Sequence, residues 1–158
     1  MGYMNNFLSQ GENLFKKIKK AGVDGLIIVD LPYEESEFFY NKLKDIDLDL
    51  IRLISPTTPK KTIEKIVQFS SGFLYYVSFR GVTGAKLSNF KEVQDKVKYI
   101  KSKTKIPVVV GFGIKEGEIA QKMSNISDGV VVGSRLIDII QQKNFRLNDS
   151  LKFLEKSL

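Results

Sequence analysis

Short apolar runs alternate with longer amphipathic segments along most of the chain. Five apolar runs are rich in β-branched and aromatic residues and have the length of buried strands: residues 25–29, 48–54, 73–77, 106–110 and 129–132. The intervening segments have the helical period, as in residues 90–101, where Val93 and Val97 fall on one side. This strand–helix repetition predicts parallel strands joined by right-handed crossovers.

The same periodicity, together with the terminal residues of each segment, predicts the helices. They cover residues 12–21, 34–43, 59–69, 90–101, 116–123, 135–141 and 147–158. Thr58 followed by Pro59 suits a helix start, with a capping hydroxyl before a proline at the first helical position. Residues 1–3 are predicted to be the end of a sixth strand. The pattern is typical of either a small open sheet or the later part of a (β/α)₈ barrel, which needs eight strands.

The length of the chain predicts one domain. Its 158 residues can bury a substantial core, and no linker or low-complexity segment divides residues 1–158. No apolar run approaches the length that spans a bilayer, and the N-terminus lacks the features of a signal peptide. We therefore expect a cytoplasmic protein that does not enter a membrane.

The absence of cysteine and histidine limits the chemistry of the chain. Without cysteine there are no disulfides, no thiolate metal sites and no cysteine nucleophile. Without histidine, proton transfer would fall to Asp, Glu, Lys or Tyr, or to another chain. No carboxylate cluster has the spacing of a metal site, so no metal is expected.

The net charge of +7 raises the question of an anionic ligand. The lysines are scattered, and most lie in segments predicted to form outer helix faces. They are not interleaved with aromatic residues, as they would be on a platform for single-stranded nucleic acid. We therefore expect no nucleic-acid site, and the charge is compatible with a small anionic ligand.

Glycine-containing loops follow three of the predicted strands: residues 78–84, Gly111-Phe112-Gly113 and Gly133-Ser134. In parallel sheets, ligands bind at the carboxyl ends of the strands, and barrel loops after the last two strands commonly bind phosphate. Backbone N–H groups, a serine hydroxyl and the N-terminus of a following helix are suitable donors. The glycines could instead form tight turns, and Ser134 could cap its helix. Their recurrence at neighbouring strand ends favours phosphate.

Single residues at the strand ends allow two interpretations each. Asp30 could be a catalytic group at the end of a buried strand, or it could cap the following helix. Tyr75 and Phe73 alternate along their strand and share a face, so they could line an aromatic pocket or pack in the core. The ring of Phe112, between two glycines, could face a ligand or the core.

Together these segments resemble one family, the tryptophan synthase alpha subunit. The matching segments occur in the family's order: Met1-Gly2-Tyr3-Met4-Asn5, residues 21–32, Ser55-Pro56-Thr57-Thr58-Pro59, residues 78–84 with Gly81-Val82-Thr83-Gly84, Gly111-Phe112-Gly113-Ile114 and Val132-Gly133-Ser134. The family is a (β/α)₈ barrel that splits indole-3-glycerol phosphate into indole and glyceraldehyde 3-phosphate. The resemblance implies a lyase of tryptophan biosynthesis with no cofactor of its own. It also implies an α2β2 assembly in which the beta subunit carries pyridoxal phosphate and receives the indole.

The resemblance also implies roles for individual residues. The phosphate would be held by Gly84, Gly113, Gly133 and Ser134. The indole pocket would be shaped by Tyr3, Ile27, Val29, Tyr75 and Phe112. Supporting catalytic roles would fall to Asp30 and to Thr83, which would position the catalytic aspartate when its loop closes. The contact with the beta subunit would include Asn5 and Pro32.

The resemblance places the chain at about strands 4–8 of the barrel, with their helices. The family's acid/base glutamate and its aspartate partner belong to strand two, so we expect both to be absent and turnover by this chain alone to be negligible. Phe73 and Arg80 depart from the family pattern. Two alternatives remain: another phosphate-binding barrel enzyme, or a non-catalytic fragment that binds the beta subunit.

Overall fold

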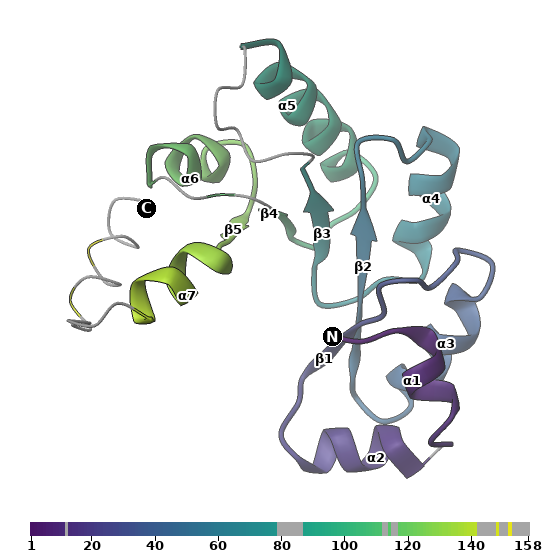
Figure 1. Ribbon diagram of the computed structural model, residues 1–158. Coiled ribbons are helices and arrows are strands. Elements are labelled where there is room, and N and C mark those ends of the chain that lie inside the picture. Colours follow the sequence, from purple (N-terminus) through teal and green to yellow (C-terminus); the bar gives the residue numbers. More distant parts are fainter. Residues whose placement is uncertain are drawn as a thin grey trace.

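Five consecutive strands form one parallel sheet in this computed structural model, which describes residues 1–11, 13–78, 87–111, 114, 117–141, 148 and 152. The strands are β1 (Gly25–Ile27), β2 (Asp49–Ile54), β3 (Leu74–Val77), β4 (Val108–Gly111) and β5 (Gly129–Val131). Their spatial order is β1-β2-β3-β4-β5, the same as their order in the chain (Figure 1). Every neighbouring pair is parallel, which confirms the predicted strand–helix–strand repetition.

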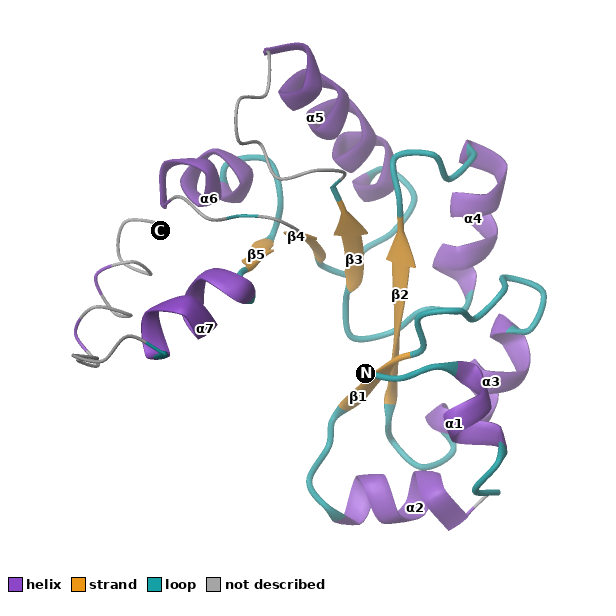
Figure 2. Cartoon of the chain, viewed as in Figure 1, coloured by secondary structure: helices purple, strands orange, loops and turns teal. Residues whose placement is uncertain are grey.

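Helices connect the strands (Figure 2). They are α1 (Met4–Leu8), α2 (Asn13–Lys20), α3 (Ser36–Lys44), α4 (Lys60–Gln68), α5 (Leu87–Lys101), α6 (Gly117–Ser124) and α7 (Ser134–Ile140). All of them except α1 were expected from the sequence within a few residues. Helix α1 has only five residues, too few for a helical period to show. The last predicted helix, residues 147–158, lies largely outside the described residues.

The start of α4 differs from the prediction. The helix begins at Lys60, and Pro59 is an extended N-cap residue without a side-chain cap. The Thr58 hydroxyl instead accepts the Ser55 N–H at 3.0 Å and lies 3.0 Å from Ser55 Oγ. The prediction that Thr58 caps the helix is therefore wrong, because its hydroxyl closes the turn after β2.

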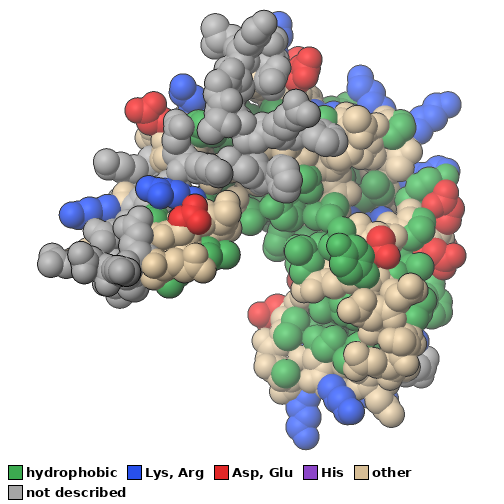
Figure 3. Space-filling view, in the orientation of Figure 1, with side chains coloured by type: hydrophobic (Ala, Val, Ile, Leu, Met, Phe, Trp, Pro, Cys, Tyr) green, Lys and Arg blue, Asp and Glu red, His purple; other side chains and the backbone are tan. Residues whose placement is uncertain are grey.

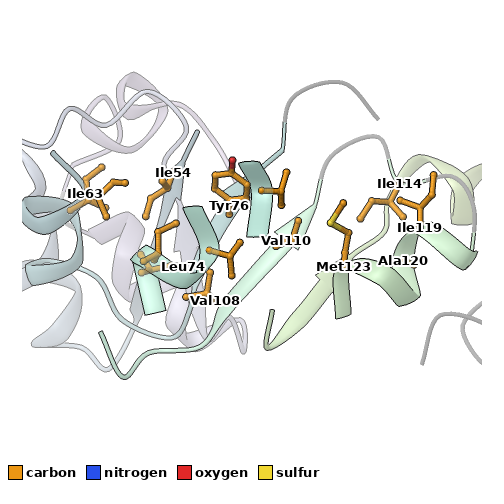
Figure 4. Close-up of a cluster of buried hydrophobic side chains, with 14 residues drawn as sticks. Ile54, Ile63, Leu74, Tyr76, Val108, Val110, Ile114, Ile119, Ala120 and Met123 are labelled. Atoms are coloured by element: carbon orange, nitrogen blue, oxygen red, sulfur yellow. The ribbon is translucent and has the colours of Figure 1, made fainter. Parts of the chain in front are cut away.

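The buried core lies on the helix side of the sheet, where α3 and α4 pack on β2, α5 on β4 and α6 on β5. Every second strand residue points there, as the period of a β-strand requires. One cluster joins these side chains to α4, α5 and α6 (Figure 4): Ile54, Leu74, Tyr76, Val108 and Val110 with Ile63, Val97, Ile100, Ala120 and Met123. A second cluster surrounds the first strands: Leu26, Ile28 and Leu50 with Phe7, Phe15, Phe39 and Leu43.

The opposite side of the sheet, here called the inner face, is apolar and only half-buried. It is formed by the alternate strand residues Ile27, Leu53, Tyr75, Val77, Val109 and Val131. In Figure 3 hydrophobic side chains line a hollow between the α7 end of the molecule and its N-terminal end. Among the described residues, the sheet therefore has one face covered by helices and one concave apolar face that these helices leave uncovered.

The N-terminal residues lie beside β1, as predicted for the end of a further strand. Gly2 forms a parallel bridge with Ile28. Its N–H donates to the Ile27 carbonyl at 3.0 Å, and its carbonyl accepts the Val29 N–H at 3.0 Å. Residues 1–3 thus occupy the position of a strand that precedes β1 in the sheet.

Candidate functional site

The carboxyl edge of the sheet brings the predicted loops together, because all five strands run in the same direction. The ends of β3 and β4 are tied there by Ser78, which is buried. Its N–H and its hydroxyl both donate to the Gly111 carbonyl, at 3.0 and 3.1 Å. The residues at which two of the predicted ligand-binding loops begin, Ser78 and Gly111, are therefore held together by hydrogen bonds.

Tyr75 and Gly111 form a close contact on the inner face. A methyl group on Gly111 would lie 2.7 Å from Tyr75 Oη and 2.8 Å from Val131 Cβ. Packing alone therefore requires glycine at this position. Tyr76 joins the helix-side core and Tyr75 faces the other way, as the strand period predicted. Burial raises the pKa of the Tyr75 hydroxyl, so the group is protonated at neutral pH.

Gly133 and Ser134 differ from Gly111 in their surroundings. A methyl group on Gly133 would meet nothing within 4 Å, and the residue is exposed. Packing therefore does not demand glycine here, whereas its backbone angles, φ −114° and ψ −83°, lie outside the main regions that other residues adopt. Ser134 is the exposed first residue of α7, and no side-chain hydrogen bond caps this helix. The N-cap residue of α7 is Gly133, so Ser134 does not occupy the capping position, and both residues are exposed.

Asp30 caps a helix, but a different one from the helix that follows it. Its Oδ1 accepts the N–H of Met4, the first residue of α1, at 2.6 Å. A carboxylate at this point satisfies a free helix N–H and complements the helix dipole. Asp30 thereby fixes the N-terminal segment, including Tyr3 and Asn5, against the end of β1. Sequence alone does not reveal this pairing, because 26 residues separate its partners.

Arg52 is a further polar residue beneath this edge, and the sequence pattern gave no sign of its role. It lies at a helix-side position of β2, with a side chain that is almost fully buried. Its Nη2 donates to the Leu31 carbonyl at 2.7 Å, while Nε has no partner. Burial lowers the pKa of Arg52 to about 10. The neighbouring Pro32 carbonyl accepts the Ser36 hydroxyl at 3.1 Å, so the turn after Asp30 is held from two sides.

The residues predicted to shape an indole pocket are partly brought together. Ile27 and Tyr75 lie on the inner face, and Val29 continues it at 39% exposure. Tyr3 lies beside the end of β1 and is 59% exposed. The remaining predicted residues lie outside the described part of the chain: Phe112, Thr83, Gly84 and Gly113. Arg80 also lies outside it, and Phe73 is half-buried just before β3.

The described residues restrict what this edge can hold. They contain no group of three Asp or Glu side chains that could bind a metal ion. None of the described helices is both long enough and apolar enough to cross a membrane. An apolar face that opens next to exposed backbone N–H groups suits a ligand with a hydrocarbon part and an anionic part.

Comparison with known proteins agrees with this geometry. The family model described as tryptophan synthase alpha chain matches residues 1–157. A tryptophan synthase alpha chain from Methanocaldococcus jannaschii is 41% identical over 155 residues, which is 96% of this chain and 55% of that protein. One from Janthinobacterium sp. is 44% identical over 142 residues, which is 89% of this chain and 54% of that protein. This chain spans about half the length of the curated relatives it matches.

Solved structures share the fold. The tryptophan synthase alpha subunit from Campylobacter jejuni superposes with a TM-score of 0.83 at 36% identity, covering 99% of this chain and 62% of that chain. A structure of the tryptophan synthase α2β2 complex from Pyrococcus furiosus gives a TM-score of 0.82 at 32% identity, covering 98% and 64%. The parallel sheet is thus part of a (β/α)₈ barrel, as predicted. The chain belongs to the tryptophan synthase alpha chain family.

Proposed function

We propose that this chain provides the indole- and phosphate-binding part of a site that cleaves indole-3-glycerol phosphate to indole and glyceraldehyde 3-phosphate. The proposal rests on one observation: the apolar inner face and the exposed Gly133-Ser134 segment meet at the carboxyl edge of the sheet. The apolar inner face ends there, and Gly133 and Ser134 border open space beside it. Membership of the tryptophan synthase alpha chain family supports this substrate.

The phosphate would bind at the start of α7. The N–H group of Ser134 precedes the first hydrogen bonds of α7, which the Leu136 and Ile137 N–H groups donate to the Gly133 carbonyl, and glycine lets a phosphate oxygen approach the backbone closely. The Ser134 hydroxyl is free to donate, since it does not cap α7. Gly84 and Gly113 would complete the phosphate site from the two neighbouring loops.

The indole ring would lie against the inner face. Ile27, Val29 and Tyr75 supply apolar surface there, and we propose that Tyr3 and Phe112 close the pocket around the ring. The raised pKa of Tyr75 makes it a hydrogen-bonding group at neutral pH and a poor general base. Tyr75 thus orients the substrate and does not move a proton.

Acid/base catalysis needs groups that the inner face lacks. Of its six residues defined above, Tyr75 is the ionisable one. We propose that the family's glutamate and aspartate come from polypeptide outside these 158 residues. Asp30 supports the site by fixing α1 at the end of β1, and Thr83 would position the aspartate. The chain alone would then bind substrate without turning it over.

The proposal includes a beta subunit as the partner that receives the indole. Asn5 and Pro32 are both exposed near the end of β1, where they are available for such a contact. Pyridoxal phosphate would belong to the beta subunit, and the chain would need no cofactor, nucleic acid or membrane. We also propose a cytoplasmic location, which membership of a biosynthetic enzyme family supports. If the chain acts only as a non-catalytic fragment, it would still bind the beta subunit, and a pull-down with purified beta subunit tests that alternative.

Indole release from indole-3-glycerol phosphate tests the catalytic part of the proposal. The purified 158-residue chain is expected to release no indole above background, while a full-length alpha chain serves as positive control. Robust turnover by this chain would contradict the proposed absence of acid/base groups.

Binding of glyceraldehyde 3-phosphate tests the phosphate site. Ser134→Ala is expected to weaken binding about tenfold, the effect of losing one hydrogen bond to a charged group. Ser9→Ala is a matched control. Ser9 is also exposed, but it follows α1 on the β1 side of the sheet, whereas Ser134 lies on the β5 side. Equal affinities for the two variants would contradict the assignment of Ser134.

A further inference from the structure

A second cavity lies on the helix side of the sheet, between α4 and α5. Its volume is about 330 Å³, which is at the small end of the range for ligand pockets. Its walls come from the turn after β2, from α4, from α5 and from Tyr76 of β3. Because Tyr76 points away from the inner face, this cavity is separate from the site proposed above.

Tyr76 places an unpartnered hydroxyl in this cavity. The residue is only 1% exposed, and its ring packs in the helix-side core. Figure 4 shows its hydroxyl oxygen pointing away from the other labelled core side chains. No other described residue forms a hydrogen bond with it. Burial and the negative charge of Glu92 raise the pKa of Tyr76 to about 12, so the hydroxyl is neutral and available.

One face of α5 lines the cavity with both signs of charge. Glu92, Asp95, Lys96 and Tyr99 are spaced by three or four residues and therefore share this face. Glu92 and Asp95 form no ion pair with any residue that the structure describes. Two carboxylates without an ion-pair partner among the described residues thus line the cavity together with Lys96 and the Tyr76 hydroxyl.

Two ammonium groups also line the cavity, one from α5 and one from α4. Lys96 Nζ donates to the Thr58 carbonyl at 2.6 Å and retains further hydrogens. Lys60 is the first residue of α4, a nine-residue helix whose N-cap provides no side-chain hydrogen bond. Its Nζ lies 4.9 Å from the centre of the Tyr99 ring, and within the described residues it has no carboxylate partner. The free N–H groups of this helix end add further donors for an anion.

We propose that this cavity binds a free α-amino acid with an apolar side chain. The ligand's ammonium group would bind between Glu92 and Asp95, and its carboxylate would bind Lys60, Lys96 and the start of α4. Its side chain would pack against the rings of Tyr76 and Tyr99. A zwitterion pairs both sets of charges at once, which an ion of one sign does not do.

The test is a binding titration of the 158-residue chain with L-leucine and L-phenylalanine, followed by ligand-observed NMR. We expect saturable binding of both amino acids. Phenethylamine, which lacks the carboxylate, and 3-phenylpropionate, which lacks the ammonium group, should each bind at least about tenfold more weakly than L-phenylalanine.

Variants locate the binding. Glu92→Gln and Lys60→Gln should each weaken it about tenfold, and Tyr76→Phe should weaken it without disturbing the packing of the ring. Lys61→Gln is the matched control, since Lys61 is an exposed neighbour of Lys60 that does not line the cavity. Glu92 and Lys60 are exposed, so their substitution leaves the core intact.

Four results would overturn the proposal. The first is the absence of saturable binding for both amino acids. The second is equal affinity for phenylalanine and for either of its two halves. The third is binding that Glu92→Gln and Lys60→Gln leave unchanged. Binding of Ca²⁺ in place of an amino acid would also overturn it, by assigning the carboxylates to a cation site.

Discussion

At the scale of single residues, two glycines at the same edge exist for different reasons. Gly111 has no room for a side chain, because Tyr75 and Val131 lie against its α-carbon. Gly133 has room for a methyl group, with nothing within 4 Å of it. The sequence presents both as glycines after a buried strand, and only the surrounding contacts distinguish a packing glycine from one that leaves space for a ligand.

Gly111→Ala is therefore expected to lower the free energy of unfolding by about 1–3 kcal/mol, the usual cost of overpacking. The Tyr75 hydroxyl end can move, but Val131 Cβ belongs to a strand and cannot shift without the backbone. Urea unfolding measures the effect. Gly133→Ala is the comparison and should lose less stability, because its added methyl group would contact nothing; a comparable loss in both variants would contradict the distinction between them.

The buried charge of Arg52 is expected to lower the free energy of unfolding. Its charge is buried with one hydrogen bond and without a carboxylate partner in the described part of the chain. We expect Arg52→Met to raise the free energy of unfolding at pH 7 by about 1–2 kcal/mol, because an apolar side chain of similar length removes the desolvation penalty.

Arg52→Lys is the comparison, since it keeps a buried charge and should not stabilise the protein. Both variants can be measured by urea unfolding. A net loss of stability in Arg52→Met would show that the bond to the Leu31 carbonyl outweighs the burial of the charge.

At the scale of elements, Asp128 joins three of them at the amino end of the sheet. It lies just before β5, and its Oδ2 accepts the N–H of Val108, the first residue of β4, at 2.9 Å. Its Oδ1 pairs with the ammonium group of Lys101 at the end of α5. The hydrogen bond from Lys101 is the main cause of the lowered pKa of Asp128.

Asp128→Asn is expected to lower the free energy of unfolding by about 0.5–1 kcal/mol at pH 7, a modest value because the ion pair is partly exposed. Since the pKa is lowered in the folded state, this stabilisation is present above the ordinary carboxyl pKa of about 4 and is lost as the pH falls below it. Thermal unfolding from pH 7 to pH 2.5 checks the prediction. A difference between the two proteins that grows toward acid pH would contradict it.

The sequence predicted the strands and longer helices because their patterns are local. Continuous apolar runs of strand length identified the strands, and the spacing of Val93 and Val97 identified α5. The pairing of Asp30 with α1 and the turn bonds of Thr58 depend on contacts or competing partners that a pattern does not contain. Arg52 was missed for a related reason, because its run of apolar neighbours predicts a strand but not what its side chain contacts.

At the scale of the whole molecule, the sheet has two unlike faces. One is sealed by helices, and the other is the apolar inner face that stays half-buried in the described residues. A closed barrel would fill this face with side chains from other strands. The chain is thus part of a tryptophan synthase alpha barrel, and its half-buried inner face is the surface on which the proposed ring site depends.

Titration of the 158-residue chain with indole-3-glycerol phosphate, followed by two-dimensional amide NMR, tests this interpretation most directly. We expect saturable shifts at the amides of Gly133 and Ser134, with accompanying shifts at Ile27, Val29 and Tyr75 on the inner side, and no release of indole. The absence of saturable shifts, or shifts confined to the helix side of the sheet, would contradict the account.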